Sequence, residues 1–200
     1  MKISFKIMFV FLAGSILFSA CKKTESSEVF DMMNFSDDTT AAAQLVEQAN
    51  QDLNKIKVMY KKNEVQREEL IAAMGDKDTE KVKKITDDLV YLINDGMSLG
   101  ESAVEKIGQA QQKNINADFK DYLSMKEESL RKQLAAFEHR RQAVRLLRDS
   151  FGTNDPAMVE KAKLDFKQKE ELFAKTMEES KEISKKASEF AKESSKKIKE

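Results

Sequence analysis

The chain has 200 residues, with 35 Lys and Arg side chains against 35 Asp and Glu, so its formal net charge is zero. This balance places it outside the strongly basic class to which nucleic-acid-binding domains belong, and we expect no nucleic-acid partner. The low content of proline (one) and glycine (six) favours a helical fold. The single cysteine excludes an intramolecular disulfide.

The first 20 residues have the layout of an export signal. Lys2 and Lys6 make the start positive, and residues 7–18 are apolar but too short to cross ~30 Å of hydrocarbon as a helix. Two small residues then precede Cys21. The segment resembles the signal of bacterial lipoproteins, whose lipobox ends in a small residue and Cys. Phe18 stands where Leu is usual, which resembles the looser spirochaete lipoboxes.

This resemblance covers residues 1–21 and implies a membrane protein held by lipid. It implies cleavage before Cys21, a diacylglycerol thioether on the sulfur, and an acyl chain such as palmitate on the new amino group. It also implies a place in the cell envelope. Lys22 and Lys23 favour the outer membrane, and exposure to the periplasm or to the outside stays open. An ordinary secretory signal and an uncleaved anchor are the alternatives.

We expect three segments: a signal peptide over 1–20, a lipidated tether over 21–38 and a helical domain over 39–200. Without its signal the chain keeps 33 basic and 35 acidic side chains. The tether is polar except for an apolar interruption, which we expect to dock on the domain or to lie at the membrane surface. Its apolar residues are Val29, Phe30, Met32, Met33 and Phe35.

Apolar residues at alternating spacings of four and three predict long helices with coiled-coil-like seams. The first helix begins near Asp38 and ends at Gly75, which we expect in the C′ position. Its seam includes two polar residues, Asn63 and Arg67. The second helix contains three glycines, which predict close approach by a neighbouring backbone. These are Gly96, Gly100 and Gly108.

The third helix covers about 119–151, with Arg141 on its seam, and the fourth begins at Pro156 and runs toward the C-terminus with Lys169 on its seam. Turn-forming residues over 111–118 leave the joint between helices two and three ambiguous. Similar helix lengths favour an all-α, antiparallel up-down-up-down four-helix bundle. The alternative is an extended three-helix rod in which helices two and three are fused.

No pattern in the chain points to catalysis, so we expect a protein that is not an enzyme. The one histidine, His139, lies among charged residues without the Glu-x-x-His spacing of a bundle metal site, and is interpreted as a surface residue. A lipidated Cys21 leaves no thiol for chemistry. We therefore predict no catalytic, metal or cofactor site and no cofactor.

Two basic clusters are candidate sites. Arg141, Arg145 and Arg148 share one helix face and form either a partner or anion patch, or ion pairs with acids of the fourth helix. The second cluster lies at the C-terminal end and is either a membrane-proximal basic patch or a solvated face. It consists of Lys192, Lys196, Lys197 and Lys199.

Two functions follow from these features. The first is a lipid-anchored envelope or surface lipoprotein that acts as a non-enzymatic protein-binding or structural module. The second is a membrane-proximal carrier or chaperone for an apolar ligand or client. The sequence predicts a membrane partner through the lipid and an unidentified protein partner, and does not indicate the oligomeric state.

Overall fold

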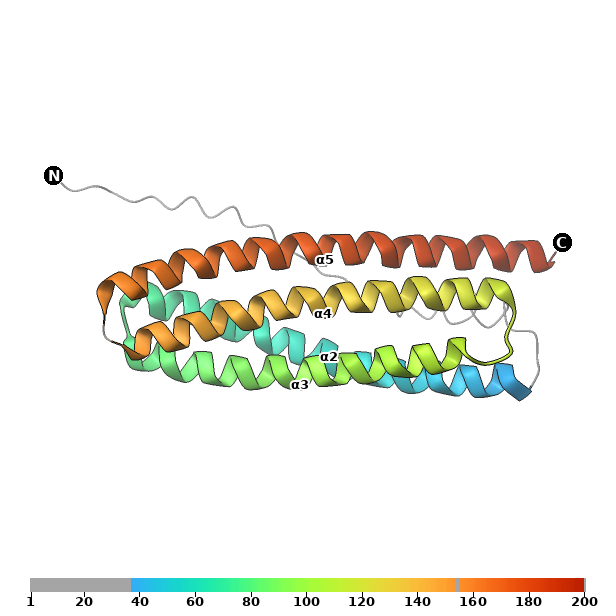
Figure 1. Cartoon of the computed structure of the whole chain (residues 1–200), viewed down its shortest axis with the longest axis horizontal. Coiled ribbons are helices and arrows are strands. Elements are labelled where there is room, and N and C mark those ends of the chain that lie inside the picture. Colours follow the sequence, from blue (N-terminus) through green and yellow to red (C-terminus); the bar gives the residue numbers. More distant parts are fainter. Residues whose placement is uncertain (1–36, 154, 200) are drawn as a thin grey trace.

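The computed structural model describes residues 37–153 and 155–199, which form four long antiparallel helices (Figure 1). With the labels of Figure 1 they are α2 (Asp37–Asp76), α3 (Thr79–Gln111), α4 (Ala117–Gly152) and α5 (Pro156–Lys199). Helix α2 packs along α3, α3 along α4 and α4 along α5, whereas α2 and α5 meet only sparsely. The predicted four-helix bundle is therefore confirmed and the fused rod is wrong.

Helices α3 and α4 each begin at a side chain that caps them, and the cap of α4 explains why these two helices are separate. Asn116 accepts a hydrogen bond from the Phe119 N–H at 2.7 Å, and Ile115 is buried in the turn before it. Asp78 caps α3 through the Lys81 N–H at 3.0 Å. Such side chains satisfy N–H groups that a helix start leaves without partners.

The end of α2 corrects the prediction made for Gly75. This glycine lies inside the helix, and the residue with the left-handed backbone is Lys77, at φ 59°. The Asp78 N–H donates to the Ala73 carbonyl at 3.0 Å, the longer bond of a Schellman motif with Lys77 at C′. The sequence signal was wrong because the motif formed two residues beyond the glycine.

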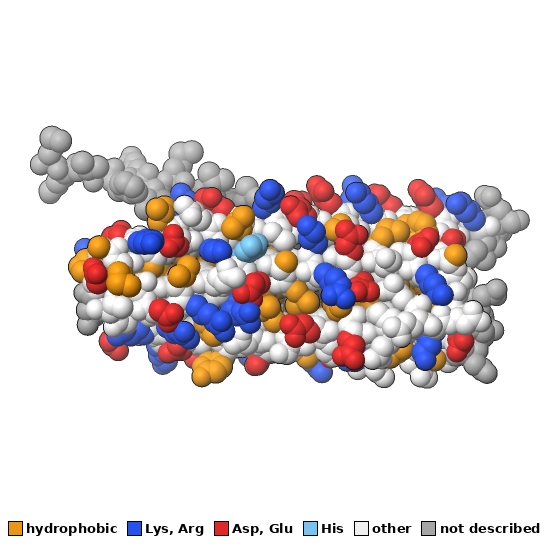
Figure 2. Space-filling view, in the orientation of Figure 1, with side chains coloured by type: hydrophobic (Ala, Val, Ile, Leu, Met, Phe, Trp, Pro, Cys, Tyr) orange, Lys and Arg blue, Asp and Glu red, His pale blue; other side chains and the backbone are white. Residues whose placement is uncertain are grey.

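The core has two parts along the bundle axis. Near the α2–α3 and α4–α5 turns, at the left of Figure 1, it is built around large side chains that include Phe137, Phe166 and Phe173. At the opposite end, where α2 begins and α5 ends, six alanines of α2, α3 and α5 accompany Phe119. Outside the core, Figure 2 shows acidic and basic side chains interleaved along the whole visible face.

A pair of serines joins α4 to α5 near the junction of these two parts. The Ser129 hydroxyl donates to the Ser180 carbonyl at 3.0 Å, and the Ser180 hydroxyl donates to the Ser129 carbonyl at 2.9 Å. Both side chains are buried. Because each hydroxyl reaches the other helix's backbone directly, the two helices must lie close together here.

Glycines on α3 were predicted to mark close approach, and they differ from one another. A Cβ at Gly100 would lie 2.6 Å from Cδ2 of Leu134, so α4 does approach this position, through a side chain rather than its backbone. A Cβ at Gly108 would make only an ordinary contact, and one at Gly96 would meet no atom within 4 Å. The predicted close approach of a neighbouring backbone is therefore wrong: only Gly100 has a close neighbour, and that neighbour is a side chain.

Candidate functional site: a buried polar layer and the hollow beside it

Several predicted site residues lie at or beyond the limits of the structure. The signal, Cys21 and residues 22–36 of the tether fall outside the described residues, as does the side chain of Lys199, whereas the last two tether residues, 37 and 38, are part of α2. Lys192, Lys196 and Lys197 are exposed on the last turns of α5. In Figure 1 this end of α5 lies at the same end of the bundle as the start of α2.

The predicted arginine patch is divided among different partners. Arg141 pairs with Glu138 on its own helix and donates to Oδ1 of Asn94 on α3 at 3.3 Å. Arg148 pairs with Asp149 at 2.9 Å and with Asp87 of α3 at 3.9 Å.

Within the described chain, Arg145 is exposed and has no ion pair. The alternative pairing with acids of α5 is not what the structure shows, because Arg141 and Arg148 turn toward α3 and their own helix instead. Two of the three charges are thus already compensated by acids of α3 and α4.

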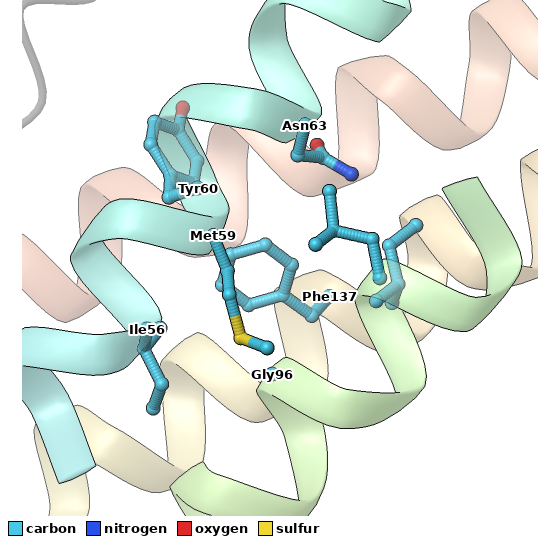
Figure 3. Close-up of a pocket in the computed structure, with 8 residues that line it drawn as sticks. Ile56, Met59, Tyr60, Asn63, Gly96 and Phe137 are labelled. Carbon is cyan, nitrogen blue, oxygen red and sulfur yellow. The ribbon is translucent and has the colours of Figure 1, made fainter. Parts of the chain in front are cut away.

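A hollow lies near the middle of the bundle between α2, α3 and α4 (Figure 3). It has room for about one water molecule. Three half-buried residues surround its mouth: Met59, Leu92 and Gly96. Its floor is formed by buried side chains. These are Ile56, Tyr60, Asn63, Ile93 and Phe137.

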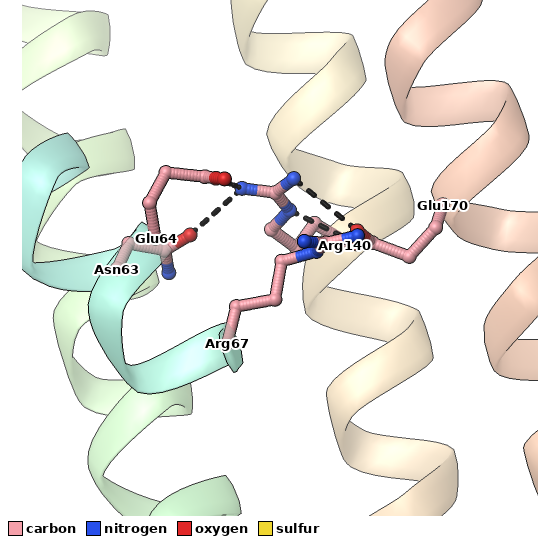
Figure 4. Close-up of polar contacts among 5 residues, drawn as sticks. All are labelled: Asn63, Glu64, Arg67, Arg140 and Glu170. Atoms are coloured by element: carbon pink, nitrogen blue, oxygen red, sulfur yellow. Dashed lines mark hydrogen bonds and ion pairs between the residues drawn. The ribbon is translucent and has the colours of Figure 1, made fainter. Parts of the chain in front are cut away.

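A layer of charged and polar side chains crosses the core against this hollow (Figure 4). We call it the polar layer; it consists of Asn63, Glu64 and Arg67 of α2, Arg140 of α4 and Glu170 of α5. Arg140 is at its centre and is only 4% exposed. Its Nε and Nη2 donate to the two carboxylate oxygens of Glu170, at 3.0 and 3.3 Å.

The same guanidinium also reaches α2. Its Nη1 donates to Oδ1 of Asn63 at 2.8 Å and pairs with Glu64. Glu170 in turn pairs with Arg67, so the two glutamates and two arginines compensate one another across three helices. A buried arginine with bidentate and additional acceptors is the arrangement in which such a charge is tolerated in a core.

Aromatic rings enclose the charge. The guanidinium carbon of Arg140 lies 3.5 Å from the centroid of the Phe173 ring, a cation–π contact. Phe173 packs edge-on against Phe137 at 5.6 Å between centroids, and Phe137 packs edge-on against Tyr60 at 6.0 Å. Phe173 therefore shields the guanidinium from water, and its ring is in contact with Phe137, one of the two rings that line the hollow.

Burial shifts the acid–base behaviour of this region. Desolvation, with the negative charge of Glu64, raises the pKa of Tyr60 to about 12 against a weaker opposing effect of Arg140. Desolvation would lower the pKa of Arg140, but the charges of Glu170 and Glu64 outweigh it and raise that pKa. Tyr60 therefore stays a neutral phenol and Arg140 a charged guanidinium at neutral pH, and neither of these two groups acts as a general base there.

A second buried carboxylate lies toward the other end of the α2–α3 pair. Asp52 accepts hydrogen bonds from Lys106 at 2.5 Å and from Ser102 at 3.0 Å, and pairs with Lys55 at 3.5 Å. Burial alone would raise the pKa of Asp52, but these hydrogen bonds and charges outweigh it and hold that pKa below its ordinary value of 3.8. Asp52 thus joins the two helices as an ion.

Sequence reasoning found two of the five residues of the polar layer. Asn63 and Arg67 were placed on the α2 seam, but Arg140 and Glu170 were missed in favour of their neighbours Arg141 and Lys169. His139, interpreted as a surface residue, is half-buried, and its Nδ1 has no hydrogen-bond partner in the described chain. Asn63 and Arg67 are polar residues on a seam that faces the core, so they need hydrogen-bond or charge partners there. A search of the facing helices for such a partner could have located Arg140.

The described part of the chain contains no cluster of metal-ligating side chains. Over residues 37–153 and 155–199, no three His, Cys, Asp or Glu side chains form a group that could hold a metal ion. None of the four described helices has an apolar stretch long enough to cross a membrane.

The chain matches no family model, no curated protein and no solved structure.

Proposed function

We propose that the protein is a lipid-anchored lipoprotein of the cell envelope whose bundle binds another protein through its outer surface, without catalysis. The membrane part of the proposal rests on the lipoprotein-like segment that ends in Cys21. The exposed lysines near the end of α5 would lie toward the same membrane, because the described chain begins at that end of the bundle (Figure 1).

The binding part rests on one observation, the polar layer. Arg140 ties α2, α4 and α5 together in the centre of the bundle, and the hollow beside it holds about one water molecule. A centre that is filled and cross-linked in this way directs binding to the outer surface. The interleaved charges of that surface suit a protein partner better than a nucleic acid, which would favour a basic face (Figure 2).

The alternative function, a carrier for an apolar ligand or client, needs interior space. Pockets for small ligands occupy about 300–1,000 Å³. The hollow at Gly96 is far smaller. The carrier would also have to break the buried charge contacts of Arg140 in order to open, at a cost of several kcal/mol. We therefore place the surface-binding module first.

Metabolic labelling with a clickable palmitate tests the anchor. We expect the full chain to carry the label and Cys21→Ala to lose it, while Ser19→Thr, a change beside the predicted cleavage site, keeps it. Label that persists in Cys21→Ala would refute lipidation at this residue.

Native mass spectrometry of the Cys21→Ala protein tests the binding module against the carrier. We expect the mass of the bare chain, because the interior is filled. A lipid bound at one molecule per chain would overturn the surface-binding proposal in favour of the carrier.

A further inference from the structure

The outer face of α2 carries two exposed valines on one line along the helix. Val58 is 60% exposed and Val65 is 57% exposed. Each valine lies two residues, or about 200° around the helix, beyond a buried residue of the core-facing seam, Ile56 or Asn63. Ala72, also exposed, follows Val65 after seven more residues, so all three share one side of the helix. This line of residues faces directly away from the core of its own bundle.

Four charged side chains flank this apolar line, and within the described chain none of them has an ion pair. Two lysines are followed, seven residues later, by two glutamates. They are Lys61, Lys62, Glu68 and Glu69, and all four are exposed. A single exposed valine would need no explanation. An apolar line with unpaired charges of both signs on its two sides is a different feature, because each part matches what the seam between two helices needs.

The spacing of these charges does not serve α2 itself. Side chains that pair along a helix are three or four residues apart. On α5, for example, Lys163 pairs with Glu160 at 2.9 Å. On each flank of the apolar line the lysine and the glutamate are seven residues apart, which is ~10.5 Å along the axis and too far for an ion pair. The acid three residues from Lys61 is Glu64, which pairs with Arg140 instead.

A second copy of α2 compensates all four charges when it runs antiparallel with the two Val65 side chains opposed. Lys61 then meets Glu68 of the second copy on one flank, and Lys62 meets Glu69 of the second copy on the other. The twofold symmetry repeats both pairs, because in such a contact the same surface is used by both copies. The charges on each flank are therefore complementary to themselves about Val65.

The apolar line fits the same arrangement. Val58 faces Ala72 of the second copy on either side of the central Val65 pair, which gives a continuous apolar strip between the flanking charges. Parallel pairing in register would oppose like charges on both flanks, and these repel. A contact of this length is smaller than the about 1,200–2,000 Å² of a stable complex, so the expected dimer is a weak one.

We propose that the outer face of α2 around Val65 is a self-association surface, through which two copies of the chain pair antiparallel. The inference rests on the proposed function and names its protein partner, a second copy. Because the two α2 helices run in opposite directions, their first turns, and with them the predicted lipid anchors, lie toward opposite ends of the pair.

Disulfide formation at single cysteines tests this arrangement. The protein is residues 21–200 with Cys21→Ser, which leaves no native thiol. Val65→Cys places a thiol on the proposed twofold axis. Val58→Cys is the matched control, because it changes the same residue type at a similar exposure. In the antiparallel pair the two positions 58 are ~21 Å apart along the axis. Cysteines whose Cα atoms are more than about 7 Å apart cannot be bridged.

At equilibrium in a glutathione redox buffer, we expect the dimer disulfide of Val65→Cys to be favoured over that of Val58→Cys by about tenfold or more, the gain that a preformed contact supplies. A mixture of Val58→Cys with Ala72→Cys should give mainly the mixed disulfide, identified by intact mass spectrometry. Equal disulfide formation at positions 65 and 58, or no excess of the mixed disulfide over its statistical share, would overturn the proposal.

Charge exchange tests the flanks independently, in the Val65→Cys protein. Lys61→Glu with Lys62→Glu makes all four flanking charges negative, and Glu68→Lys with Glu69→Lys makes all four positive. Each double variant alone should lose the preference for the disulfide, because like charges then face each other. An equimolar mixture of the two should recover the preference, as a mixed disulfide. A mixture that forms no more disulfide than the separate variants would contradict the antiparallel pairing.

The control for charge exchange is Lys167→Glu with Lys175→Glu, which makes the same change of charge at exposed positions of α5. This variant should keep the preference of its Val65→Cys parent. Circular dichroism should show the same helical content for all variants, because every substitution is on the surface. Both tests use unlipidated protein, so a chain that fails to self-associate overturns this inference alone, while the palmitate and native mass tests decide the proposed function separately.

Discussion

The two kinds of polar contact in the core have opposite effects on the helices that they join. Ser129 and Ser180 have short side chains, and each hydroxyl bonds the backbone of the facing helix, so α4 and α5 are drawn together. Arg140 has a long side chain that needs acceptors from two other helices, so it holds α2, α4 and α5 at a distance that a guanidinium can span.

This difference shows which contacts fix the positions of the helices relative to one another. The serine contact reinforces α4 and α5, which already pack closely as neighbours in sequence. The polar layer joins α2 to α5, which otherwise meet sparsely, through the ion pair of Arg67 with Glu170. If α2 moved by one helix turn relative to α4 and α5, Arg140 would remain buried but would lose its acceptors on α2. We therefore infer that the polar layer sets the register of α2 against α4 and α5.

The largest effect is expected from Glu170→Ala. It removes both carboxylate contacts of Arg140 and leaves a buried charge with the two α2 acceptors alone, so we expect a loss of about 3 kcal/mol in the free energy of unfolding. Urea unfolding followed by circular dichroism measures this. Glu178→Ala is the control, because that side chain on the same helix is 63% exposed and should cost under about 0.5 kcal/mol. A loss below about 1 kcal/mol for Glu170→Ala would contradict the role given to the layer.

A smaller effect is expected at the serine contact. Ser180→Leu inserts a branched side chain where α4 and α5 are closest, and overpacking of this kind costs about 1–3 kcal/mol. Thermal unfolding should show a lower Tm, whereas Lys185→Leu, at an exposed position of α5, should leave it nearly unchanged. An unchanged Tm for Ser180→Leu would mean that the two helices can separate there without loss.

The smallest effect concerns Asp52, a buried acid outside both contacts. Its pKa is lower in the folded protein than its ordinary value of 3.8, so its ionised form favours folding. This contribution is complete above the unfolded pKa and is lost as the pH falls through the lowered folded pKa. Unfolding free energies measured between pH 6 and pH 2 should therefore fall less steeply for Asp52→Asn than for the parent protein. Parallel pH profiles would show that Asp52 is not coupled to folding.

Much of the architecture could be predicted from the sequence, because it depends on the spacing of apolar residues. The α2 seam was placed correctly through Asn63 and Arg67, and the breaks near 111–118 and before Pro156 coincide with side-chain caps. The centre of the polar layer could not be predicted in the same way. Arg140 and Arg141 are adjacent, about 100° apart around the helix, and a seam with spacings of three and four does not decide between them.

The hollow could not be predicted at all from the sequence. Gly96 and Gly100 are the same residue type on the same helix, and the sequence does not distinguish them. They differ because Leu134 of α4 covers Gly100 and not Gly96. The side-chain nitrogen of Asn63 has no hydrogen-bond partner in the described chain, which is also a result of packing, since it depends on which of the two amide atoms Arg140 binds. Contacts between helices that are distant in sequence determine both features.

The placement of the first turn of α2 and the last turn of α5 at one end of the bundle has a mechanical consequence (Figure 1). A force applied between these two turns would separate the helices from that end and break their contacts one after another. A pull between the first turn of α2 and the Lys77 turn would instead run along α2 itself, which joins these two points directly. If Cys21 is held in a membrane, a partner that binds far from it would therefore meet the stiffer response.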